Sequence, residues 1–363
     1  MTEPDDFLRD RLRPPPQGGP AGRPTPPRAN GPRPAPFQRR AQRPMLGAQR
    51  PPWDGIQVSP PVGVKPRRPG AKYGWRRMVY QVTFGLINLG PSAHEKQEAA
   101  FESAIASALR GNYKVGVLGK GGVGKTTVAA SVGSIFAELR RQDRVVAIDA
   151  DTAFGRLGSR IDPHTCGSYW EIAADRNLQS FTDVSTRVGS NSAGLYVLAG
   201  EPTAGPRRVL DPAVYREATS RLDRHFTISI IDCGSTMDTP VTQEVLSDLD
   251  ALIVVSSPWA DGASAAAQTM EWLASHGRGS LLRRTVVVLN DSDGHSDKHT
   301  RSVLARQFLD RRQTVVEVPF DPHLRPGGVI DVKEEMARTT RRKFLQIAAA
   351  IAGFFASRPE GVR

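Results

Sequence analysis

Short apolar runs recur through residues 111–357, and they alternate with stretches whose apolar residues are three or four positions apart. Seven runs are candidate strands, and most of them are continuous in Val, Ile and Leu rather than alternating, which is typical of strands covered on both faces in a parallel sheet. They are Lys114–Leu118, Val145–Asp149, Leu195–Leu198, Thr227–Asp232, Ala251–Ser256, Thr285–Asn290 and Thr314–Val318. The pattern predicts an α/β fold with a doubly wound, mostly parallel sheet.

Helical spacing is clearest on either side of the first predicted strand. Ser92 and Glu95 have capping-box spacing and begin a helix that we expect Gly111 to end. Apolar residues recur at helical spacing from Val128 to Arg140, directly after a glycine-rich stretch. The sequence therefore predicts helix, strand, loop and helix in succession.

A last helix is predicted over residues 339–357, with Phe344, Ile347 and Ile351 on one side and basic residues at its start. Two interpretations stay open. The helix either packs on the body of the protein or lies on a membrane surface, as a helix with an apolar side and basic residues can do.

Charge and proline are concentrated at the N-terminus. The chain has a net charge of +12, and residues 1–90 carry 16 Lys and Arg against 5 Asp and Glu. Residues 1–70 also hold 18 of the 29 prolines, a composition that does not bury enough apolar surface to fold. We predict a disordered Pro/Arg-rich tail over 1–70, an aromatic and basic junction with a lead-in helix over 71–110, and the folded domain over 111–358.

Apolar and aromatic residues return between Lys72 and Gly90, beside Arg76 and Arg77. One interpretation is an extension packed on the body of the protein. The other is a docking segment for a partner or an anionic membrane surface.

Cysteine usage and the N-terminus favour a cytoplasmic protein. Cys166 and Cys233 are the two cysteines, and neither their number nor their spacing predicts a metal site or a disulfide framework. The start of the chain is acidic, with no apolar core of a signal peptide, and no run approaches the length that spans a bilayer.

The first predicted strand leads into a phosphate-binding motif with the spacing G-x-x-x-x-G-K-T. Glycines let successive backbone N–H groups point inward, and the helix that follows adds its positive end. Lys125 is expected to reach the β- and γ-phosphates, and the Thr126 hydroxyl to bind Mg²⁺. The predicted nucleotide-binding loop is Gly119, Lys120, Gly121, Gly122, Val123, Gly124, Lys125, Thr126 and Thr127.

Carboxylates follow two of the predicted strands. Asp149 and Asp151 come at the end of one, and Asp232 ends another. Since parallel strands present their carboxyl ends at one edge of the sheet, these acids are expected near the phosphates and Mg²⁺.

The pattern K-G-G-x-G-K-T-T, with Lys120 as an additional lysine, resembles the deviant Walker A box of the MinD/ParA-like ATPases, which are P-loop proteins of the SIMIBI type. The resemblance implies ATP hydrolysis in a homodimer that forms when ATP is bound, with Lys120 crossing to the phosphates of the partner subunit. It also implies that Asp151 positions the attacking water, that Asp149 lies beside the metal, and that Asp232 holds Mg²⁺ through water. Lys120, Lys125 and Asp151 are the predicted catalytic residues.

The resemblance also predicts the base site. Asn290 is expected to face adenine, and the backbone of Pro319, Phe320 and Asp321 to close over the base. The alternative is GTP, because Asn290 and Asp293 have the N-x-x-D spacing of guanine recognition, although the usual lysine is missing.

One departure concerns the γ-phosphate switch, where Asp-Cys-Gly-Ser-Thr from Asp232 stands in place of Asp-x-Pro-Ala-Gly. As a whole, the chain looks most like the MinD-like ATPases associated with mycobacterial type VII secretion. That likeness implies secretion-apparatus proteins as partners of the tail, and a cytoplasmic location that includes the inner face of the plasma membrane. The alternatives are a partitioning ATPase whose basic tail binds DNA, and a nucleotide-sensing scaffold with little turnover.

Overall fold

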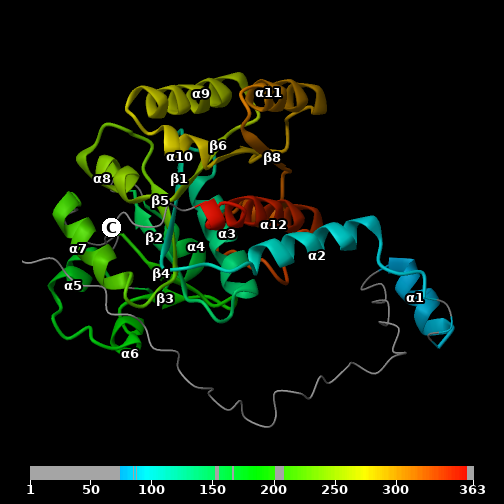
Figure 1. Cartoon of the computed structure of the whole chain (residues 1–363), viewed down its shortest axis with the longest axis horizontal. Helices are drawn as coiled ribbons and strands as arrows, with labels where there is room; N and C mark the ends of the chain where they lie inside the picture. The colour runs from blue at the N-terminus through cyan, green and yellow to red at the C-terminus, as the bar shows by residue number, and fades with distance from the viewer. Residues whose placement is uncertain are drawn as a thin grey trace, which may run out of the picture. The chain divides into compact units, whose positions relative to one another are not determined.

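A computed structural model describes residues 74–84, 86, 88–151, 155–165, 167–200 and 208–357. The tail predicted over residues 1–70 lies outside these ranges, as do Tyr73, Ile87 and Cys166, so the boundary at residue 70 stays a prediction. The described strands form one sheet in the order β3-β4-β2-β5-β1-β6-β7-β8 (Figure 1). This is the predicted doubly wound topology, with the first strand in the middle.

All seven predicted strands are confirmed, and they pair in parallel. Their bounds are β1 Tyr113–Gly119, β2 Val145–Ala150, β4 Leu195–Leu198, β5 Ile228–Cys233, β6 Ala251–Ser256, β7 Thr285–Asn290 and β8 Thr314–Val318. The strand that was not predicted is β3 Gly189–Ser190, which pairs antiparallel with β4. Two residues are too few to produce a hydrophobic period.

Helices cover both faces of the sheet (Figure 1). One face is covered by α2 Ala93–Ile105, α3 Lys125–Leu139, α4 Leu157–Ile161 and α12 Arg338–Ala352. The other is covered by α5 Tyr169–Ala174, α6 Phe181–Ser185, α7 Pro212–Leu222, α8 Pro240–Asp248, α9 Ala260–Ser275, α10 Gly279–Arg283 and α11 Lys298–Asp310. Helix α1 Gly74–Val82 comes before α2, and the 3₁₀ turns η1 Pro322–Leu324 and η2 Phe355–Ser357 flank α12.

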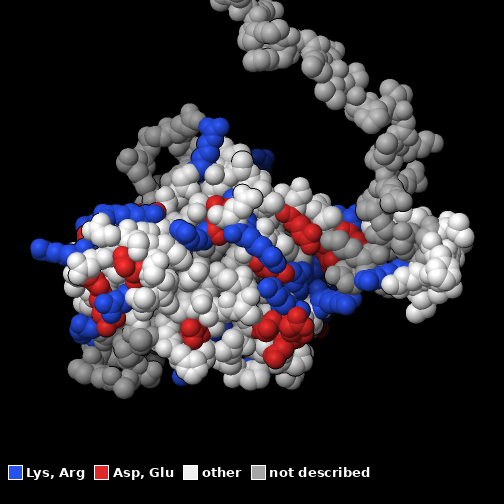
Figure 2. Space-filling view, turned by 90° about the horizontal axis from the view of Figure 1, so that it is seen from below, with Lys and Arg blue, Asp and Glu red and all other residues white. Residues whose placement is uncertain are grey.

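The surface of the folded body carries mixed charge. Lys and Arg side chains lie next to Asp and Glu side chains on the face shown in Figure 2. This agrees with the sequence, in which the positive excess belongs almost entirely to residues 1–90.

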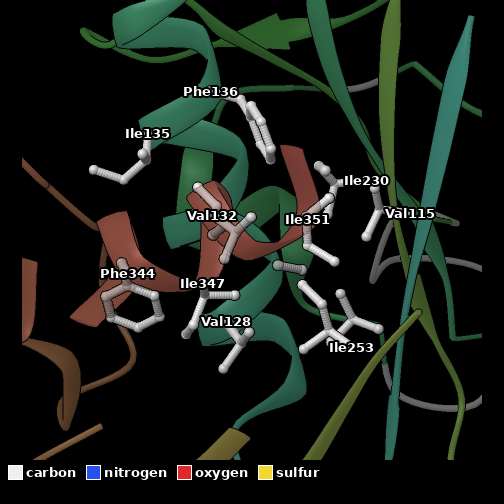
Figure 3. Packing of buried hydrophobic residues seen from close by; sticks show 14 of the residues in the cluster. Val115, Val128, Val132, Ile135, Phe136, Ile230, Ile253, Phe344, Ile347 and Ile351 are labelled. Carbon is white, nitrogen blue, oxygen red and sulfur yellow. The ribbon is translucent and has the colours of Figure 1, made fainter. Parts of the chain in front are cut away.

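Two hydrophobic layers hold the helices to the sheet. Neighbouring strand residues contribute to opposite layers, as Val117 and Leu118 do, because successive side chains of a strand point to opposite faces. Figure 3 shows the layer in which α3 and α12 pack against the sheet. Its labelled side chains are Val115, Val128, Val132, Ile135, Phe136, Ile230, Ile253, Phe344, Ile347 and Ile351.

The apolar side of α12 is part of this core. Phe344, Ile347 and Ile351 are fully buried, so they are not available to a lipid surface. The packed interpretation of the C-terminal helix is therefore right, and its membrane interpretation is wrong for these side chains. No helix among the described residues is both long and apolar enough to cross a membrane.

The capping box at the start of α2 is confirmed, since Ser92 Oγ accepts from Glu95 N and the Glu95 carboxylate accepts from Ser92 N. The expectation that Gly111 ends this helix is wrong, because α2 ends at Ile105. The guanidinium of Arg140 donates to the carbonyl oxygens of Ile105 at 2.6 Å and Ser107 at 2.7 Å. These bonds satisfy carbonyl groups that a longer helix would have used.

The segment after residue 72 is less buried than we expect of an extension packed on the body of the protein. Met78, Val82, Phe84 and Leu86 are between 66% and 96% exposed. For these four side chains, packing on the body of the protein is wrong.

Candidate functional site

The glycine-rich loop runs from the end of β1 to the start of α3. Gly122 and Gly124 have φ of +84° and +93°, which glycine adopts without strain, and Gly124 is the N-cap of α3. Val123 between them is buried in the core and anchors the loop. The sequence thus places a helix N-terminus, with its unpaired N–H groups, directly behind the loop.

The loop borders a cavity of about 750 Å³ at the carboxyl ends of the strands. Most predicted site residues line it: Gly121, Gly122, Gly124, Lys125, Thr126, Thr127, Asp151, Asn290, Pro319, Phe320 and Asp321. Gly119, Lys120, Val123, Asp149 and Asp232 do not belong to its lining. The remaining walls come from Arg156 and α4, from Ser235, from Asp291 and Ser292, and from the loop around Leu324–Gly327.

The two lysines of the loop have different surroundings. Lys125 is buried, and its Nζ donates to the carbonyl oxygen of Lys120 at 3.3 Å. The side chain of Lys120 is half-exposed, with its Nζ 2.7 Å from Asp261 Oδ2 in the first turn of α9. Lys125 is thus aimed along the loop, whereas Lys120 forms a surface ion pair outside the cavity.

The oxygen atoms suited to a metal lie beside the start of α3. Thr126 Oγ1 donates to Asp232 Oδ2 at 2.6 Å, and Asp232 Oδ1 is buried with no hydrogen-bond partner among the described residues. Burial raises the pKa of Asp232 to about 7, because a carboxylate is poorly solvated there without a cation. A hydroxyl and a carboxylate oxygen are hard donors, so these residues fit Mg²⁺.

Asp149 lies beside Asp232 in the sheet register, but its carboxylate is engaged by the backbone. Its oxygens accept from the N–H groups of Asp151 at 3.1 Å and Leu157 at 3.0 Å. Burial, with Asp232 as a neighbour, raises the pKa of Asp149 to about 8. A Cβ at Gly155 would lie 2.4 Å from Asp149 Oδ1, which explains the glycine. These contacts hold the loop after β2, and the predicted place of Asp149 beside the metal stays a prediction.

On the side of the cavity where the base is predicted, the Asn290 amide is buried and donates to the carbonyl oxygen of Val123 at 2.9 Å. Asn290 therefore fixes the glycine-rich loop as well as lining the cavity. The Asp321 carboxylate accepts from His323 N and Ala337 N, which leaves the backbone of Pro319 to Asp321 for contacts with a ligand.

Asp293 is not part of the lining, and its carboxylate accepts from His295 N and Trp259 Nε1. Asp293, on which the guanine alternative depends, is thus engaged outside the lining, and the choice between adenine and guanine stays a prediction.

Arg160 in α4 is a site residue that sequence reasoning missed. It is buried, and its guanidinium donates to the carbonyl oxygens of Leu324 at 2.9 Å and Gly328 at 2.8 Å, and to Thr127 Oγ1 at 3.1 Å. Burial lowers the pKa of Arg160 from its usual range. Arg160 thus connects the start of α3 to the loop on the base side of the cavity.

Replacing Arg160 with lysine is expected to weaken ATP binding about tenfold, because an ammonium group cannot bond all three acceptors in the same geometry. Binding of inorganic triphosphate should change much less, since the glycine-rich loop keeps its conformation. Titration calorimetry with both ligands measures the difference. Arg156→Lys, at an exposed arginine that also lines the cavity, is the matched control. Equal losses for ATP and triphosphate would contradict a role on the base side.

This cavity, bordered by a glycine-rich loop between a central strand and a helix, defines a P-loop nucleotide-binding protein. The chain belongs to the CobQ/CobB/MinD/ParA nucleotide binding domain family, whose model matches residues 116–326. More narrowly, it is 32% identical over 285 residues to the ESX-1 secretion-associated protein EspI of Mycobacterium tuberculosis. That alignment covers 78% of this chain and 42% of EspI, so the chain spans less than half the length of this relative.

Solved structures show the same fold. A ParA family ATPase from Chlorobium tepidum TLS has a TM-score of 0.52 at 20% identity, covering 66% of this chain and 98% of its own. The cell division ATPase MinD of Pyrococcus furiosus has a TM-score of 0.51 at 21% identity, covering 67% and 99%. The family match confirms the predicted family, and these solved structures confirm the predicted fold class.

Proposed function

We propose that this protein binds and hydrolyses ATP with Mg²⁺, dimerises when ATP is bound, and serves a type VII protein secretion system. The observation that carries the enzymatic part is the Thr126–Asp232 pair beside the glycine-rich loop, with a buried carboxylate oxygen left over for a metal shell. The likeness to EspI, which is described as ESX-1 secretion-associated, supports the secretion part.

In this proposal the N–H groups at the start of α3 and the Lys125 ammonium bind the β- and γ-phosphates. Thr126 and Asp232 hold Mg²⁺, which when bound neutralises charge on the phosphate oxygens. Asp151 lines the same cavity, and a Cβ at Gly234 would lie 3.8 Å from its Oδ1, which supports a role for Asp151 near the γ-phosphate switch. Asp151 orients the attacking water, and Asn290 with the backbone of Pro319–Asp321 holds adenine.

Lys120 has a different role in each state of the protein. In the single chain its ammonium group pairs with Asp261, and the partial exposure of both side chains makes the pair weak. In the ATP-bound homodimer, Lys120 leaves Asp261 and reaches the phosphates of the partner subunit, where several negative charges meet it.

The test combines molecular size and turnover. With ATP and Mg²⁺ the full chain should elute as a dimer, and with ADP or without nucleotide as a monomer. Lys120→Ala should lower steady-state phosphate release at least about tenfold while ATP binding by Lys125 persists. The matched control is Lys298→Ala, an exposed lysine on α11. A monomer in all three conditions would remove the dimer mechanism, and negligible turnover in the wild type would favour the nucleotide-sensing scaffold, whose altered switch begins at Asp232.

The Pro/Arg-rich tail lies outside the described residues, and its partners are proposed from composition and from the likeness to EspI. We assign it to proteins of a secretion apparatus, and the protein to the cytoplasm, including the inner face of the plasma membrane. Co-purification with secretion components supports this assignment. Retention on non-specific DNA that is lost on deleting residues 1–70 would support the partitioning ATPase instead.

A further inference from the structure

Ser235 is a cavity residue that has no role in the function proposed above. It lies in the turn between β5 and α8, it is exposed, and it lines the same cavity as Lys125 and Thr126. Among the residues that the structure describes, none forms a hydrogen bond with the Ser235 hydroxyl group. This hydroxyl is therefore available to a ligand in the cavity.

The sheet brings Ser235 to the end of the cavity where the phosphates are proposed to bind. Strand β5 lies between β1, which leads into the glycine-rich loop, and β2, which leads to Asp151. Asp232, three residues before Ser235, accepts from the Thr126 hydroxyl at 2.6 Å. A Cβ at Gly234 would lie 3.8 Å from Asp151 Oδ1. The residues proposed to hold the base follow β7 and β8, which lie on the other side of β1.

We propose that the Ser235 hydroxyl donates a hydrogen bond to the γ-phosphate of ATP, so that the turn after β5 distinguishes ATP from ADP. This inference rests on the proposed function, because it needs ATP in the cavity. In that function Asp151 orients the water that attacks the γ-phosphate. A donor on the Asp151 side of the cavity therefore faces this phosphate rather than the sugar or the base.

The Ser235 side chain is part of the altered γ-phosphate switch. The sequence from Asp232 reads Asp-Cys-Gly-Ser-Thr where Asp-x-Pro-Ala-Gly is usual, so Ser235 stands in place of an alanine. An alanine side chain has no donor, whereas a serine hydroxyl can donate to a phosphate oxygen, and hydrogen bonds to a charged acceptor are the stronger ones. At this position, the departure from the usual sequence supplies a donor that the usual sequence lacks.

The experiment is titration calorimetry of the full chain with Mg²⁺ and either ADP or the non-hydrolysable β,γ-imido analogue of ATP. Ser235→Ala should weaken binding of the ATP analogue about tenfold, because a hydrogen bond to a charged group is lost. Binding of ADP should change less than about twofold, since ADP has no γ-phosphate. Ser235→Thr keeps a hydroxyl group at this position and should bind the ATP analogue within about threefold of the wild type.

The matched control is Thr236→Ala, which removes an exposed hydroxyl from the next residue of the turn, outside the cavity lining. It should bind both ligands like the wild type. The inference is overturned if Ser235→Ala binds the ATP analogue as tightly as the wild type, if it loses ADP binding to the same extent, or if Thr236→Ala shows the same loss. Each of these outcomes leaves nucleotide binding by the wild type intact, whereas a wild type that binds neither ligand would overturn the proposed function together with this inference.

Discussion

Gly124→Ala is expected to weaken ATP binding at least about 100-fold and to destabilise the protein by about 3 kcal/mol. Two costs add at this position. The φ of +93° is strained for alanine, and the new Cβ would lie 2.4 Å from Asn290 Nδ2. That contact pushes away the amide that donates to the Val123 carbonyl oxygen, so the loop loses both its conformation and its support. Urea unfolding and titration calorimetry measure the two effects.

Alanine variants of the neighbouring glycines, Gly122 and Gly121, distinguish the cost of backbone strain from the cost of the steric clash. Gly122 has φ of +84°, and a Cβ there would meet no atom within 4 Å, so Gly122→Ala should cost only the backbone strain, about 1 kcal/mol. Gly121 has neither a positive φ nor a neighbour within 4 Å, and Gly121→Ala should leave stability within about 0.5 kcal/mol of the wild type. If Gly124→Ala cost no more than Gly122→Ala, Asn290 would not support the loop.

The local pattern of hydrophobic residues and glycines was sufficient to predict most strands of the sheet and the phosphate-binding loop. Most of the strands are buried on both faces, so most appear as runs of Val, Ile and Leu. Parallel pairing then brings Asp232 to the same edge as the glycine-rich loop. The loop was predictable because its glycines and lysines act through spacing along the chain. Strand β3, with two residues, had no such signal.

Contacts between distant parts of the sequence were not predictable. Arg160 bonds carbonyl groups 164 and 168 residues away, and Lys120 pairs with an aspartate 141 residues away. The end of α2 depends on Arg140, which lies 35 residues beyond it. The environment of the C-terminal helix was not predictable for the same reason. A helix with basic residues at its start and one apolar side can either lie on a membrane surface or pack into the core of a protein. Burial of Phe344 distinguishes the two, and only the fold supplies that.

Lys114 is another residue whose role depends on distant partners. Its side chain is 2% exposed at the start of β1, where Nζ lies 2.8 Å from Asp223 Oδ2 and also bonds Asp248. The backbone N–H of Lys114 donates to Asp250 Oδ2 at 2.9 Å. A cation is therefore enclosed by carboxylates at the edge of the sheet opposite the nucleotide site.

Lys114→Met is expected to lower the free energy of unfolding by about 3 kcal/mol, because Asp223 and Asp248 then lose the buried ammonium group that both of them contact. Urea unfolding at neutral pH measures the loss, and ATP affinity should be unchanged because the site lies at the other end of β1. The control is Lys298→Met at an exposed position, with a loss below about 0.5 kcal/mol.

A combined variant distinguishes charge from packing. Adding Asp223→Asn and Asp248→Asn to Lys114→Met removes the two charges that the ammonium group contacted, so it should recover a large part of the stability that Lys114→Met loses. If Lys114→Met alone loses less than about 1 kcal/mol, or if the combined variant recovers nothing, the ion cluster does not hold this edge of the sheet. Recovery would show that the cost lies in the lost ionic contacts, and that the methionine itself fits the space beside the ends of α7 and α8.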